Sequence, residues 1–127
     1  MNLFFQVLKG DAHEATIDIQ DEHFDRKTEY NPWRMSAFNR EFYAVFTRQK
    51  EGGWYFWLWF LGLTREAKKY SSEIAIYSDD KQVVYRGIVY SLRTTATEIM
   101  KNGSCMILSG IYFLFWLQTI LANLIEK

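Results

Sequence analysis

The sequence predicts a mainly β fold, an antiparallel β-sandwich with one short helix. Apolar residues recur at every second position over most of the chain, turn-forming residues separate these stretches at strand-like intervals, and only one stretch has helical spacing. The chain has 127 residues, of which 49% are hydrophobic and 18% aromatic, so it can bury a sizeable core. We therefore expect a single domain over residues 1–127.

Alternation predicts strands in the first half of the chain. Residues 15–19 and 42–47 both place apolar side chains on one face. Gly52 and Gly53 follow the second stretch and accept the positive φ of a hairpin turn. The next stretch, residues 54–61, is aromatic on both faces, which is typical of a central strand covered on both sides. An exposed binding surface is the less common alternative.

A second hairpin and a helix follow. Residues 72–77 and 82–85 flank the turn sequence Ser-Asp-Asp, and the preceding REAKKY predicts a short helix or a turn. The one convincing helical spacing comes next, and Asn-Gly at 102–103 ends it. Its apolar face consists of Leu92, Ala96, Ile99 and Met100. Ile99 and Met100 must pack on the sheets, because three threonines give this short helix little intrinsic stability.

The C-terminal region permits two interpretations. No charged side chain occurs from residue 102 to residue 125, and residues 105–117 are almost continuously apolar. A helix of this length can span a bilayer. Gly110 and several polar residues instead fit two buried strands with a turn between them. We favour the soluble interpretation, and any membrane contact would run through residues 102–125.

Composition excludes several function classes. Lys and Arg total 15, as do Asp and Glu, so the zero net charge gives no general attraction for nucleic acid. Cys105 has no partner for an internal disulfide, and with His13 and His23 it cannot form a zinc finger. We expect no metal, no cofactor and no secretory signal, and a cytoplasmic location, with the nucleus as a further compartment.

Other candidate chemistry has a simpler structural explanation. The acidic residues at 18–25 lack the glycine turn and final glutamate of a calcium loop, so a solvated acidic loop is favoured. Cys105 begins an apolar strand with no basic neighbour, which favours a buried thiol over a nucleophile. Arg65, Lys68 and Lys69 form a small basic patch, for which a solvated helix face is the default.

The order of segments resembles a known family. The segments are residues 36–62 (SAFNREFYAVFTRQKEGGWYFWLWFLG), 65–76 (REAKKYSSEIAI) and 83–108 (VVYRGIVYSLRTTATEIMKNGSCMIL). Together they resemble the substrate-binding, TRAF-like domain of the seven in absentia (SINA, Siah) family of ubiquitin ligases. A weaker match extends back to residues 8–11 and 15–19. The specificity lies in order and spacing, since none of these pieces is a catalytic motif.

The resemblance implies a TRAF-like β-sandwich that dimerises and captures short extended degron peptides at a sheet edge for ubiquitin-dependent degradation. The implied partners are degron-containing proteins and SINA-type ligases, as homo- or hetero-dimers. The family's RING and zinc modules have no counterpart here, so ligase activity would have to come from a partner or from residues outside this sequence. Whether the protein is an enzyme therefore stays open. The hydrophobic segment 109–127 departs from the family's polar loop and closing strand.

Three residues match the family's peptide groove. Leu8 corresponds to the first strand of the groove, and Trp33 and Met35 are the nearest equivalents of its Trp-containing strand. The alternative, that all three are ordinary sandwich residues, stays open. A membrane-anchored protein with a C-terminal tail and a cytosolic β domain is the second functional hypothesis.

Overall fold

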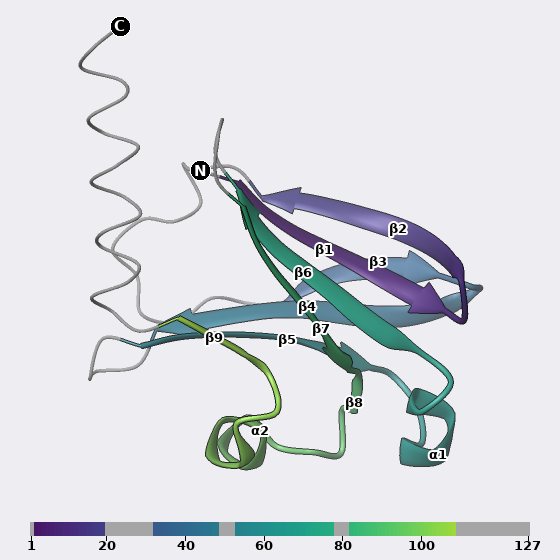
Figure 1. Cartoon of the computed structure of the whole chain (residues 1–127). Coiled ribbons are helices and arrows are strands. Elements are labelled where there is room, and N and C mark those ends of the chain that lie inside the picture. Colours follow the sequence, from purple (N-terminus) through teal and green to yellow (C-terminus); the bar gives the residue numbers. More distant parts are fainter. Residues whose placement is uncertain (1, 20–31, 49–52, 78–81, 109–127) are drawn as a thin grey trace, which may run out of the picture.

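Two β-sheets face each other in the computed structural model, which describes residues 2–19, 32–48, 53–77 and 82–108 (Figure 1). The first sheet has the order β2-β1-β6-β7 and is antiparallel throughout. Its strands are β1 (Asn2–Lys9), β2 (Ala12–Ile19), β6 (Ser71–Tyr77) and β7 (Gln82–Ile88). The predicted hairpin of residues 72–77 and 82–85 is confirmed by the pairing of β6 with β7.

The second sheet has the order β3-β4-β5-β8, and β9 also pairs with β5. Its strands are β3 (Trp33–Ala37), β4 (Arg40–Arg48), β5 (Trp54–Phe60), β8 (Tyr90–Ser91) and β9 (Met106–Leu108). β4 and β5 form the predicted hairpin. The pairing of β5 with β8 is parallel, an exception to the antiparallel sandwich that the sequence predicts. Two helices, α1 (Thr64–Ala67) and α2 (Ala96–Asn102), complete the described fold.

The main core lies between the sheets. Its members alternate along each strand, as the sequence predicts for β4, where Phe42, Ala44 and Phe46 are buried. Tyr70, between α1 and β6, joins the sheets through its ring, whose centroid lies 5.1 Å from that of Phe42 and 5.4 Å from that of Phe60. Burying one such aromatic side chain stabilises the fold by roughly 1.5–3 kcal/mol. The members of the core range from Leu3 of β1 to Leu108 of β9, so the core depends on strands that lie far apart in the sequence.

A second cluster covers the outer face of the second sheet. Val45 and Trp57 lie there beneath Ile99 of α2, with Cys105 beside them. β5 consequently has both faces covered, the commoner of the two interpretations of its aromatic sequence. Its inner face carries Trp54, Phe56, Leu58 and Phe60, and its outer face carries Tyr55, Trp57 and Trp59.

α2 is shorter than the apolar spacing indicated. Thr95 is its N-cap and accepts a hydrogen bond from the Glu98 N–H, while Gly103 ends the helix at a φ of 70°. Leu92 lies before the cap and is 38% exposed, so its assignment to the apolar face of the helix is wrong. The predicted roles of Ile99 and Met100 in packing are confirmed. The capping threonine explains the difference, because its side chain satisfies a backbone N–H that would otherwise be unpaired.

Some predictions concern residues outside the described ranges. The turns at 51–52 and 78–80, most of the acidic loop and segment 109–127 are among them. β9 supplies one strand within the uncharged region that begins at residue 102. No helix among the described residues is long and apolar enough to cross a membrane.

The cap of α2 can be tested by Thr95→Ala. The change removes the acceptor for the Glu98 N–H and should lower the free energy of unfolding by about 1 kcal/mol. Thr97→Ala is the matched control, because Thr97 is an exposed residue within the same helix. That control should be neutral or slightly stabilising. Equal urea midpoints for the two variants would contradict the capping role.

The Cys105 thiol should be unreactive in the folded protein. It is 5% exposed, and burial raises its pKa from 9.0 to about 11, which confirms the prediction of a buried thiol. A shift of this size lowers the thiolate fraction at neutral pH by roughly a hundredfold. We expect slow reaction with Ellman's reagent in buffer and fast reaction in denaturant. Equal rates in both conditions would contradict this account.

Candidate functional site

Two edge strands from different sheets lie side by side. Among the described strands, β2 is one edge of the first sheet, with β7 at the other edge, and β3 is one edge of the second sheet. The two contact each other at one side of the sandwich (Figure 1). An edge strand has N–H and C=O groups that no neighbouring strand pairs, and an extended peptide can pair with them. The predicted site residues can be placed relative to these edges.

Trp33 and Met35 share the inner face of β3. Met35 lies opposite Phe42 of β4, is 5% exposed and belongs to the main core. Trp33 lies opposite Ala44, is half-buried and packs against the same core. The structure therefore brings these two residues together on an edge strand, with most of the Met35 surface already used in packing.

Leu8 lies apart from that pair, on β1 of the other sheet. Leu3, Phe5 and Val7 of β1 are buried toward the core, so Leu8 belongs to the alternate, outward-facing set and is half-buried. Its neighbour on β2 is His13. The role of Leu8, Trp33 and Met35 in binding a peptide stays a prediction.

A tight turn follows β3 and contacts β2. Phe38 and Asn39 join β3 to β4 with φ values of 51° and 62°. Asn tolerates this left-handed conformation, whereas Phe rarely adopts it. Two contacts hold Phe38: its N–H donates to the Glu14 carboxylate of β2, and its ring lies 5.9 Å from that of Tyr70. Glu14 thus links β2 to the end of β3.

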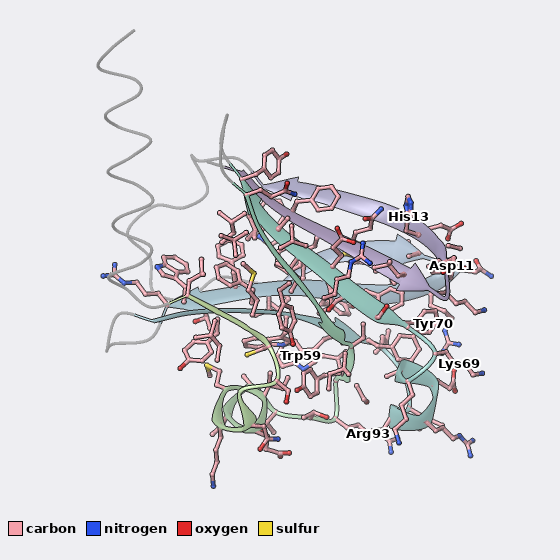
Figure 2. The ribbon with its side chains drawn as sticks, in the orientation of Figure 1. Asp11, His13, Trp59, Lys69, Tyr70 and Arg93 are labelled. Carbon is pink, nitrogen blue, oxygen red and sulfur yellow. The ribbon has the colours of Figure 1, made fainter. Side chains whose placement is uncertain are left out.

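Polar residues beside the edges were not among the predicted site residues. Gln6 Nε2 lies 2.7 Å from His13 Nδ1 on the outer side of the first sheet, and His13 projects away from the core (Figure 2). On β3, Arg34 and Ser36 are exposed, and Arg34 forms an ion pair with Glu41. Alternation on β3 could have identified its two exposed residues, because they separate the inward-facing ones. His13 contacts Gln6 across the hairpin of β1 and β2, whereas the contact of Glu14 with the Phe38 N–H joins two different sheets.

Two tyrosines have perturbed pKa values: Tyr85 packs against the main core and Tyr90 packs against the outer cluster. Burial raises the pKa of Tyr85 and of Tyr90, and Tyr90 Oη donates to the Ser104 carbonyl at 2.8 Å. No three His, Cys, Asp or Glu side chains gather as metal ligands in the described ranges. The two edge strands have backbone groups that can pair with an extended peptide. The polar side chains beside these strands can select the sequence of such a peptide.

Comparison with known proteins agrees with this architecture. A family model described as Sina, TRAF-like domain matches residues 35–124, more than half of the chain. The match begins at Met35, so Leu8 and Trp33 precede it, and it extends through most of segment 109–127. No curated protein matches the chain. A domain of this family implies protein–protein interaction and substrate binding. Two facing sheets and a match over most of the chain lead to one conclusion: the protein belongs to the Sina, TRAF-like domain family.

Proposed function

We propose that the chain is a substrate-binding adaptor that captures extended degron peptides and holds the attached proteins for ubiquitin-dependent degradation. The observation that carries this proposal is the juxtaposition of the edge strands β2 and β3. The family match supports substrate binding by the domain. A ubiquitin-loaded conjugating enzyme would be recruited by a RING of a SINA-type partner, with which the chain would form a hetero-dimer in the cytoplasm.

The peptide would bind mainly through its backbone at β3. Backbone pairing gives affinity with little sequence preference, so selectivity must come from neighbouring side chains. Trp33 supplies a half-buried aromatic surface on this strand, while the exposed Arg34 and Ser36 lie on its other face. Because Met35 is almost fully buried, Trp33 is the strongest candidate for an anchor. An aromatic residue contributes large contact area at low conformational cost.

A labelled peptide with the family's Pro-x-Ala-x-Val-x-Pro pattern should bind with micromolar affinity, about 7 to 8 kcal/mol. Trp33→Ala should weaken binding by roughly thirtyfold, about 2 kcal/mol, with an unchanged circular dichroism spectrum. Tyr55→Ala is the matched control, since Tyr55 is a half-buried aromatic residue on the outer face of β5. It should leave the affinity unchanged.

Thermal melts of the same proteins separate binding from packing. If Trp33 is instead a core residue, its truncation should cost roughly 3 to 5 kcal/mol of stability. Leu8→Ala reports separately on the first sheet, because Leu8 lies on its outward face. A folded wild-type protein that shows no peptide binding would refute the proposed site.

The membrane-anchored alternative rests on the absence of charge from residue 102 to residue 125. It predicts that the protein stays in the pellet after carbonate extraction of cell membranes, and that deletion of the residues after Gly110 releases it. The adaptor proposal predicts recovery in the supernatant with or without that deletion. A pulldown with full-length SINA-type ligase tests the hetero-dimer independently. A chain that remains monomeric and never co-purifies with the ligase would exclude it.

A further inference from the structure

A second surface lies at the end of the sandwich formed by α1 and by the loop between β8 and α2. Leu61 follows β5 and is 50% exposed, while Leu92 follows β8 and is 38% exposed. Because β5 and β8 run parallel with Phe60 opposite Ser91, the two leucines occupy the next matching positions. They therefore form an exposed apolar pair on two adjacent chain segments.

Hydrogen bonds fix the backbone on both sides of this pair. The Leu61 N–H donates to the Glu41 carbonyl and the Leu92 N–H donates to the Phe60 carbonyl, each at 3.0 Å. Ser91 is buried, and its hydroxyl donates to the Gly62 carbonyl at 2.6 Å, which ties the two loops together. The backbone that carries the two leucines is therefore ordered before a partner binds. Binding would cost little conformational entropy on this side of the interface.

Basic side chains surround the leucines. Arg65, Lys68 and Lys69 on or just after α1 are exposed, as is Arg93 next to Leu92. Contacts join α1 to β8, and Figure 2 shows Lys69 and Arg93 at this same end of the molecule. Four cations thus gather there in a chain whose total charge is zero. The sequence predicts a solvated helix face for Arg65, Lys68 and Lys69. That prediction does not account for Arg93 or for the two exposed leucines beside them.

The nearby carboxylates are already engaged. Glu66 is the sole acidic residue of segments 61–70 and 90–97, both of which are described. Arg40 binds it at 2.7 Å, and the hydrogen bond with Arg40 lowers the pKa of this carboxyl. Glu98 lies just beyond and contacts Thr95 in the cap of α2. The four exposed cations therefore retain an excess of positive charge.

We propose that this surface docks an acidic, amphipathic segment of a partner protein, with its leucines covering Leu61 and Leu92 and its carboxylates facing the four cations. Charge complementarity argues for an acidic occupant, and the apolar pair argues against one held by charge alone. A protein segment is favoured over a lipid surface because a domain of this family engages proteins. The surface is separate from β3 and would bind independently of a degron.

Fluorescence anisotropy with a labelled Glu-Glu-Leu-Asp-Glu-Leu-Glu-Glu peptide tests the proposal on the full chain. The wild-type protein should bind this peptide, and binding should weaken as salt is added. A probe with Gln and Asn in place of Glu and Asp should bind at least about tenfold more weakly, as should a probe with Ser in place of Leu. Equal binding of the acidic and neutral probes would overturn the proposal.

Variants then locate the binding. Lys68→Glu combined with Arg93→Glu should weaken the acidic probe by about tenfold or more, and Leu61→Ser combined with Leu92→Ser should do the same. Lys101→Glu is the matched control, because Lys101 is an exposed cation in the last turn of α2. It should leave binding unchanged, and all variants should keep the affinity for the degron peptide.

Two further outcomes would overturn the proposal. One is binding to phosphatidylserine vesicles without binding to the acidic peptide, which would make the surface a lipid site. The other is unchanged peptide affinity in both double variants. Measurements with the three peptide probes on the wild-type protein remain decisive if a double variant fails to fold.

Discussion

The fold depends on burying both faces of β5. This strand places Trp54, Phe56, Leu58 and Phe60 toward the first sheet, and Trp57 toward α2. Successive side chains of a strand point to opposite faces, so the apolar side chains of β5 cannot all be buried on one side of the sheet. A second layer is therefore needed on each face, supplied by the first sheet and by the short helix. α2 in turn needs its threonine cap and Gly103, since its sequence has little helical stability of its own.

Both proposed binding surfaces lie at the boundary of this core. One is the edge formed by β2 and β3, and the other is the basic end formed by α1 and the loop after β8. β2 and β3 are edge strands, and the strands next to them, β1 and β4, bury their inward-facing side chains in the main core. The contact of Glu14 with the turn at Phe38 holds β2 and β3 together. The geometry of the candidate peptide site therefore depends on contacts between the two sheets. The basic end is produced by the two loops that leave β5 and β8 in the same direction. A peptide on the edge and a partner segment on the end could be held at the same time.

Much of the fold could be predicted from local pattern. Alternation located β4, the continuous aromatic run after the glycine turn located β5, and turn residues between apolar stretches located the β6–β7 hairpin. Each of these signals depends on neighbours in sequence. The helix boundary was less well predicted, since Leu92 fits the apolar spacing although the cap lies after it. The site was predicted through the family resemblance, which selected Trp33 and Met35 without showing that Met35 belongs to the core.

The sequence by itself determined that the protein is a β-sandwich with a helix ending at Gly103, because alternation and capping act over a few residues. Tertiary structure alone decided that β5 and β8 pair in parallel, that Glu14 reaches the Phe38 N–H, and that Arg93 joins the basic residues of α1. These contacts join residues far apart along the chain. They form only when the two sheets pack and close the intervening loops, a condition that no local pattern contains.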